Sequence, residues 1–302
     1  MRRRKKSLVC TAILSGLVIS CLIYHSGKRG EILPVHQSEV LWNTKEELAL
    51  LSGIENKIRR AEQGTAGTIP VYSSASGYEA ICPEMQAGIP ETGKEPVNEE
   101  KKTAFLTFDD GPSRQTEKIL DILKRYGIKA TFFVVSKDLT QSGTEALQRA
   151  AKEGHVIGMH SDSHEYKKIY ASVESLMKDY EKVYRMIQET TGITPQLYRF
   201  PGGSYNSVGR QCILKTIPEM ERRGFIYFDW NVTAEDAVGN PTASSIRKNV
   251  FGNIEHINQP VILMHDGSCN SLTAEVLPGI IEELIQRGYS FDTLDHRKPC
   301  CF

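Results

Sequence analysis

The chain lacks two patterns that would indicate common metal sites. None of its seven cysteines forms a CxxC pair, so a zinc site built from cysteines is not expected. It also contains no HExxH segment and no cluster of carboxylates for two metal ions. These absences argue against a zinc metallopeptidase and against a two-metal phosphoesterase.

The sequence has no excess of positive charge. Its formal net charge is zero, and five of its 37 basic residues stand together at positions 2–6. The remaining 32 basic residues face 37 acidic ones, so the rest of the chain carries a net charge of −5. Nucleic-acid binding depends on neutralising phosphates. We therefore expect no nucleic-acid partner, and no segment indicates a protein partner.

Charge is missing altogether from residues 8–24, LVCTAILSGLVISCLIY. An uncharged run after a basic cluster is typical of a membrane anchor whose amino terminus stays in the cytoplasm. We expect a single-pass cell-membrane protein, with residues 1–26 as basic segment and anchor and the rest extracytoplasmic. Two other fates stay open. Residues 18–21 have the form of a lipobox that would attach lipid to Cys21, or the chain is cleaved and secreted.

Five cysteines follow this anchor and would meet an oxidising exterior: Cys82, Cys212, Cys269, Cys300 and Cys301. Because their number is odd, at least one must stay free or pair with another chain. Their pairing stays open.

Residues 27–100 are expected to connect the anchor to a catalytic part. Apolar residues recur with roughly helical spacing over residues 39–63, which predicts a helix. From residue 64 the segment is rich in Gly, Pro, Ser and Thr without an apolar period. This composition indicates a flexible stalk.

Beyond residue 101, short apolar strands alternate with helices. We expect strands at 104–108, 130–135, 156–159, 197–200, 225–228, 261–264 and 289–291, and helices near 116–126, 145–153, 173–190, 213–223 and 274–287. This order predicts an α/β fold with a parallel sheet covered by helices. Residues 101–302 should form a distorted (β/α) barrel of about seven strands.

Polar side chains that could bind a metal or take part in catalysis stand at the carboxyl ends of these strands. TFDDG closes the first strand with Asp109 and Asp110. Because neighbouring strand residues project in opposite directions, one carboxylate could bind a metal while the other faces the attacking water. HSDSH places His160 and His164 four residues apart, which in a helical turn would direct both rings to one cation. Asp110, His160 and His164 together predict a three-ligand metal site with room for water.

Three further segments follow in order: RFPGG at 199–203, WNVTAED at 230–236 and LMHDG at 263–267. With TFDDG and HSDSH, they resemble the motifs of the polysaccharide deacetylase domain, also called carbohydrate esterase family 4 or the NodB-like domain. The resemblance covers roughly residues 102–295. It implies an amide hydrolase that removes N-acetyl groups from a glycan and releases acetate.

The resemblance implies a role for each matching residue. Asp109 would be the general base, held by Arg199, and His265 the general acid, oriented by Asp236. The three-ligand site would hold one divalent ion, usually zinc, with cobalt, nickel or manganese as alternatives. The remaining substrate-binding positions are a backbone donor at Gly202 and two walls of an acetyl pocket, Trp230 and Leu263.

Nearby charges should tune the acid and the base. Arg199 should favour the ionised form of Asp109 and extend activity to lower pH. Asp236 should raise the pKa of His265 and keep that acid protonated at neutral pH.

The substrate is less sharply indicated than the reaction. Gly202 stands where the family often has Tyr, so a side-chain wall of the groove is lost, and Thr233 and Ala237 replace a frequent Asp and Trp. The membrane anchor favours a cell-wall glycan, and we expect N-acetylglucosamine of peptidoglycan. Alternatives are chitooligosaccharide deacetylation, xylan O-acetyl ester cleavage and a catalytically silent glycan-binding module.

Overall fold

The computed structural model describes residues 11–14, 17–20, 77–88 and 97–298. They fall in two units, Met1–Ile69 and Pro70–Phe302.

In the first unit, β1 (Thr11–Leu14) pairs antiparallel with β2 (Leu17–Ser20). Both strands lie within the stretch in which we expected an anchor helix, and the rest of that stretch lies outside the described residues. The helix expected at 39–63 also lies outside them. Within the parts of the chain that are described, no helix has the length and apolar character needed to cross a membrane.

The second unit is built on a parallel sheet. Its strands are β3 (Thr103–Asp109), β4 (Thr131–Val135), β5 (Val156–Ser161), β6 (Leu197–Tyr198), β7 (Ile226–Tyr227), β8 (Val232–Thr233), β9 (Val261–His265) and β10 (Ser290–Phe291). The pairing order is β7-β6-β5-β4-β3-β9-β8, and β10 pairs with β3. β7 and β8 end this order and do not pair with each other within the described residues, so the sheet is an open curl. The predicted α/β fold with a parallel sheet is confirmed.

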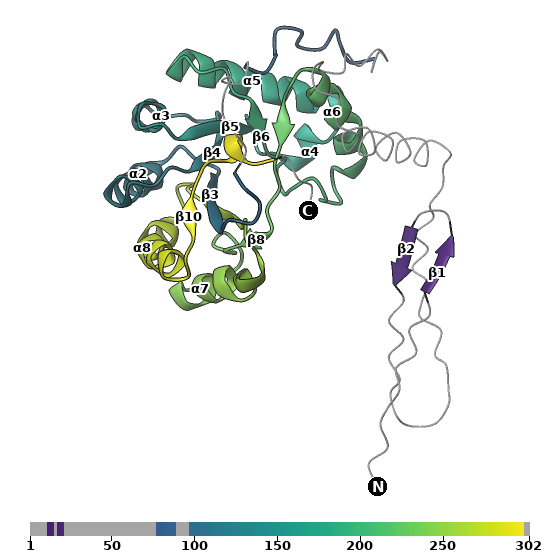
Figure 1. The fold of residues 1–302 in the computed structure, drawn as a ribbon. Helices are drawn as coiled ribbons and strands as arrows, with labels where there is room; N and C mark the ends of the chain where they lie inside the picture. The colour runs from purple at the N-terminus through teal and green to yellow at the C-terminus, as the bar shows by residue number, and fades with distance from the viewer. Residues whose placement is uncertain (1–10, 15–16, 21–76, 89–96, 299–302) are drawn as a thin grey trace. The chain divides into compact units, whose positions relative to one another are not determined.

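Helices surround the strands (Figure 1). They are α2 (Arg114–Tyr126), α3 (Gln141–Lys152), α4 (Tyr166–Ile169), α5 (Val173–Thr191), α6 (Arg210–Arg222), α7 (Ala243–Phe251) and α8 (Ser271–Gln286). Their ends follow local capping chemistry. In α5, for example, the Ser172 hydroxyl accepts a hydrogen bond from the Ser175 amide, and Gly192 ends the helix with φ of 75°.

Strand alternation separates two apolar layers. On β3, Leu106 and Phe108 belong to the large cluster between the sheet and the helices, whereas Phe105 belongs to a smaller cluster inside the curl. Thr107 and Asp109 stand two and four residues after Phe105, so they lie on the same face of the strand and point to the inside of the curl. Apolar packing therefore fills the inside of the curl, and polar groups take over at the carboxyl end of the strand.

The segment 77–88 packs on this unit through α6. Met85 is fully buried, and the Arg223 guanidinium donates to the carbonyl oxygens of Cys82 at 2.5 Å and Ile81 at 2.6 Å. Glu219 accepts from Arg223 Nε at 2.7 Å. The packed unit therefore begins before residue 101, where the sequence placed the start of the catalytic domain, because this buried arginine uses carbonyls of the preceding segment.

Candidate active site

Asp110, His160 and His164 form a cluster at the carboxyl ends of β3 and β5. Each offers one ligand atom, and these atoms lie within 4.8 Å of one another. Asp110 Oδ1 is 3.5 Å from His160 Nε2 and 3.3 Å from His164 Nε2. Ligand atoms about 2.0–2.1 Å from a tetrahedral zinc would be about 3.3 Å apart. Among the described residues Asp110 Oδ1 has no hydrogen-bond partner although it is buried, so these residues fit a divalent cation.

The two carboxylates of TFDDG do not diverge as strand alternation predicted. Asp110 has φ of 75°, in the left-handed region, so the extended chain ends at Asp109. Asp109 Oδ2 is 3.8 Å from His160 Nε2, while Asp110 also approaches that nitrogen. A side chain at Gly111 would collide with the Asp266 carboxylate, because a Cβ there would be 2.1 Å from its Oδ2. The turn therefore brings both carboxylates to the same cluster.

The two histidines do not share a helical turn, which corrects the prediction. His160 belongs to β5, whereas His164 follows it in an irregular turn with φ of 53°. The His164 amide donates to Ser161 Oγ at 2.8 Å. His160 Nδ1 lies 2.9 Å from the Arg199 carbonyl oxygen, which directs Nε2 to the cluster. Burial lowers the pKa of His160 to about 3, so the ring is neutral and can offer a lone pair.

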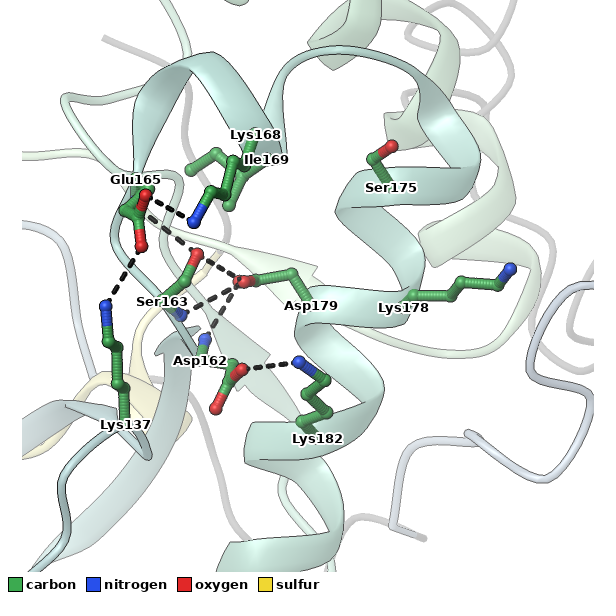
Figure 2. Close-up of a pocket in the computed structure, with 10 residues that line it drawn as sticks. All are labelled: Lys137, Asp162, Ser163, Glu165, Lys168, Ile169, Ser175, Lys178, Asp179 and Lys182. Carbon is green, nitrogen blue, oxygen red and sulfur yellow. Dashed lines mark hydrogen bonds and ion pairs between the residues drawn. The ribbon is translucent and has the colours of Figure 1, made fainter.

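Asp179 of α5 holds the loop between the histidines (Figure 2). Its Oδ2 accepts from Ser161 Oγ at 2.5 Å and from the Asp162 amide at 2.8 Å. Its Oδ1 accepts from the Ser163 amide at 3.0 Å and from Ser163 Oγ at 2.9 Å. We did not predict this residue from the sequence. The signal was a lone aspartate on the apolar face of an expected helix, where charged residues are rare unless paired.

Figure 2 also shows a pocket of about 450 Å³ beside this loop. Its lining residues are Lys137, Asp162, Ser163, Glu165, Lys168, Ile169, Ser175, Lys178, Asp179 and Lys182. None of them was predicted to be catalytic or to bind metal. Glu165 pairs with both Lys137 and Lys168, and Asp162 pairs with Lys182. Since these lysines already have carboxylate partners, we place the chemistry at the Asp–His–His cluster and not in this pocket.

Arg199 fixes Asp109 from inside the curl. The arginine is fully buried, and its Nη1 donates to Asp109 Oδ1 at 2.9 Å and to Thr107 Oγ1 at 2.8 Å. Its Nε donates to the Phe228 carbonyl at 2.8 Å, so one guanidinium ties β3 to the end of β7. Burial raises the pKa of Asp109 above its ordinary value, although Arg199 opposes this. Arg199 therefore favours the ionised carboxylate, as expected, but burial outweighs it, and the net pKa of Asp109 lies above the ordinary value.

His265 lies opposite Asp109 in the β3–β9 register. Its Nδ1 is 2.8 Å from Asp236 Oδ1, and its amide donates to Asp236 Oδ2 at 2.8 Å. Thr273 Oγ1 also donates to Asp236 Oδ2, at 2.6 Å. Burial lowers the pKa of His265, but the hydrogen bond to Asp236 and the negative charges nearby outweigh it and raise the pKa to about 9. Asp236 thus holds the His265 ring through Nδ1. The ring is protonated at neutral pH, and its Nε2 remains available to donate a proton.

Two of the three predicted substrate-binding residues, Leu263 and Trp230, lie close to residues of this acid–base site. Leu263 is buried on β9 two residues before His265, so both face inward. The Arg199 guanidinium carbon lies 5.6 Å from the centre of the Trp230 ring. Gly202 is exposed with φ of 75°, and its N–H has no backbone hydrogen-bond partner in the described part of the chain.

Two further aspartates position the surrounding loops, and we did not predict either. Asp229 accepts from the amide and the hydroxyl of Ser204, which follows RFPGG. Asp266 is fully buried, its Oδ2 accepts from Thr116 Oγ1 at 2.5 Å, and its amide donates to the Asp109 carbonyl at 3.0 Å. Burial raises the pKa of Asp266 to about 7. Each lies within two residues of the carboxyl end of a strand, a position similar to that of Asp109 at the end of β3.

The three cysteines that the structure describes form no disulfide. Cys82 and Cys212 are buried free thiols, and Cys269 is an exposed one. Cys300 and Cys301 lie outside the described residues.

Comparison with known proteins agrees with this geometry. The family model for polysaccharide deacetylase matches residues 97–216. YheN of Bacillus subtilis, which carries that family name, is 36% identical over 198 residues, covering 64% of this chain and 67% of YheN. A peptidoglycan-N-acetylglucosamine deacetylase of Bacillus cereus is 33% identical over 198 residues, covering 64% of this chain and 69% of that protein.

A solved structure gives the same result. The catalytic domain of peptidoglycan N-acetylglucosamine deacetylase from Eubacterium rectale superposes with a TM-score of 0.63 and 32% identity, covering 71% of this chain and 98% of that one. The chain therefore belongs to the polysaccharide deacetylase family, whose members hydrolyse amide or ester bonds of acetylated glycans.

Proposed function

We propose that the chain removes N-acetyl groups from N-acetylglucosamine of peptidoglycan and releases acetate. The observation that carries the proposal is the pairing of Asp109 and His265 across β3 and β9, beside the Asp–His–His cluster. A fixed carboxylate and a protonated imidazole supply the two proton transfers that amide hydrolysis needs. The relatives from Bacillus cereus and Eubacterium rectale that act on peptidoglycan support this substrate.

Asp110, His160 and His164 would hold one divalent ion, and their donor set of one carboxylate and two imidazoles suits zinc. Cobalt, nickel and manganese accept the same kinds of ligand. When bound, such an ion polarises the amide carbonyl and lowers the pKa of the attacking water.

The protein residues perform the remaining steps. Asp109 accepts the proton of the attacking water, in an orientation fixed by Arg199. The N–H of Gly202, which has no backbone hydrogen-bond partner among the described residues, is available to the oxyanion of the tetrahedral intermediate. His265 then donates its Nε2 proton to the departing amine, while Asp236 keeps Nδ1 protonated and the ring in place.

We further propose an extracytoplasmic location with a membrane tether. Its support is the basic cluster at residues 2–6 followed by the uncharged stretch 8–24. A lipid attached at Cys21 and secretion are the alternatives. Fractionation of cells would place the full chain with the membrane, and accumulation in the medium would favour secretion.

Acetate release from peptidoglycan, N-acetylglucosamine oligosaccharides and acetylated xylan tests the substrate. We expect the highest kcat/KM on peptidoglycan. A higher value on the oligosaccharides or on xylan would reassign the substrate within the family. Glycan binding without release of acetate from any of the three would indicate a silent binding module.

A further inference from the structure

Tyr166 occupies the space beside Gly202. It is the first residue of α4 and lies two residues after His164, whose ring meets it edge-on with centroids 5.5 Å apart. A Cβ at Gly202 would be 2.6 Å from the Tyr166 hydroxyl oxygen. The tyrosine hydroxyl thus lies between the loop that carries His164 and the RFPGG loop.

A neighbouring tyrosine shows that this hydroxyl is not needed to join the two loops. Tyr170 packs against Tyr166 with ring centroids 5.8 Å apart, and its hydroxyl donates to the Pro201 carbonyl at 2.7 Å. Tyr170 is buried and performs the structural task. Tyr166 is only half-buried, and its hydroxyl has no hydrogen-bond partner among the described residues. Its polar end is therefore free to meet a ligand.

Glycine at position 202 makes this arrangement possible. A larger residue would drive its side chain into the Tyr166 hydroxyl, and φ of 75° already disfavours one. From the sequence, Gly202 indicated that a side-chain wall of the groove was lost. Tyr166 supplies a side chain on that side from a different loop.

We propose that Tyr166 is a substrate-binding residue and that its hydroxyl hydrogen-bonds to the N-acetylated sugar unit held at this site. A phenol both donates and accepts hydrogen bonds, and it matches the hydroxyl and acetamido groups of such a sugar. The ring gives the sugar an apolar surface beside that polar contact. The proposal rests on the proposed function, since the ligand it assigns is the glycan substrate.

The test is Tyr166→Phe in the full, metal-loaded chain, with the tetramer of N-acetylglucosamine as substrate. Loss of one neutral hydrogen bond should raise KM about three- to tenfold. We expect kcat to change less than about twofold, because the contact is made in the bound ground state as well as in the transition state. The melting temperature and the metal content should stay at the wild-type values, since the hydroxyl bonds to no described residue.

Two other tyrosines serve as controls. Tyr126 is the last residue of α2, and its hydroxyl donates a hydrogen bond to Glu282. Tyr126→Phe removes that hydroxyl and should leave KM unchanged. Tyr170→Phe leaves the Pro201 carbonyl without its donor and should lower the melting temperature.

An unchanged KM in Tyr166→Phe would overturn the inference. So would a KM increase that follows a loss of metal, because Tyr166 would then act only by packing on His164. If the wild-type chain releases no acetate at all, the proposed function fails separately. Calorimetric binding of the tetramer would then decide, and equal affinity in the wild type and Tyr166→Phe would reject the inference.

Discussion

Asp236 touches both the ring and the backbone of His265, and this double contact sets the charge of the proposed acid. Burial alone would lower the pKa of the imidazole, whereas Asp236 and the negative charges nearby raise it to about 9. The protonated form is therefore present below about pH 9, and activity should fall as the pH rises through that value.

Asp236→Asn should move this basic limb of the pH–rate profile to lower pH. The substitution removes the charge that stabilises the imidazolium, and burial then dominates. The profile of kcat/KM measures the shift. Asp292→Asn is a matched control, because Asp292 holds His296 at 2.6 Å in a pair that is not part of the site. An unchanged basic limb in Asp236→Asn would mean that another group serves as the acid.

His164→Ala should abolish tight metal binding. Mutation of residues that only hydrogen-bond to a metal ligand typically lowers the metal affinity about 10–100-fold. Loss of a ligand itself should therefore lower the metal affinity more than about 100-fold. Metal analysis after dialysis measures this, with the exposed His256→Ala as control. Wild-type metal content in His164→Ala would remove that residue from the site.

At the scale of elements, one helix supports the loop between the two histidines. Asp179→Ala leaves a buried donor of Ser161 and part-buried donors of Asp162 and Ser163 without their acceptor. We expect the free energy of unfolding to fall by about 1–3 kcal/mol and the metal affinity to fall with it.

Denaturant unfolding and metal titration would measure both effects of Asp179→Ala. Glu174→Ala, which breaks only an exposed ion pair with Lys178 on the same helix, should change neither beyond about 0.5 kcal/mol. Full metal affinity in Asp179→Ala would show that the loop holds its shape unaided.

Apolar patterning predicted the long elements and the short strands β6, β7 and β10, but it missed α4, α7 and β8. β3, β4, β5 and β9 are continuous apolar runs, and α5 buries a regular face, so each could be read from local sequence. α7 buries only Ile246 and Val250, and β8 is two residues long and pairs with β9. Such elements depend on tertiary partners that no local period reveals.

The sequence identified which residues come together at the site better than it predicted how their side chains are oriented. Periodicity assumes regular backbone, whereas Asp110 and His164 have positive φ, so neither side chain points where a strand or helix would place it. Asp179 could not be linked to the histidine loop, because the two meet only when α5 packs on β5. The net rise of the Asp109 pKa could not be predicted, because burial is a property of the folded chain.

At the scale of the whole molecule, the segment 77–88 belongs to the folded catalytic unit. A chain that begins at Gly77 should keep the melting temperature and the acetate release of the full chain. A chain that begins at Lys101 loses buried Met85 and the carbonyl partners of Arg223, and it should lose at least about 2 kcal/mol of stability. Equal melting temperatures for the two truncated chains would show that the segment only rests on the surface.

Acetate release from peptidoglycan by the full chain tests the account most directly. It should be measured after removal of metal by a chelator, after addition of one equivalent of Zn²⁺, and in Asp109→Asn. The account predicts that the chelated chain is inactive, that zinc restores activity, and that Asp109→Asn stays inactive while still binding metal. Undiminished release from the chelated chain, or a wild-type rate in Asp109→Asn, would contradict it.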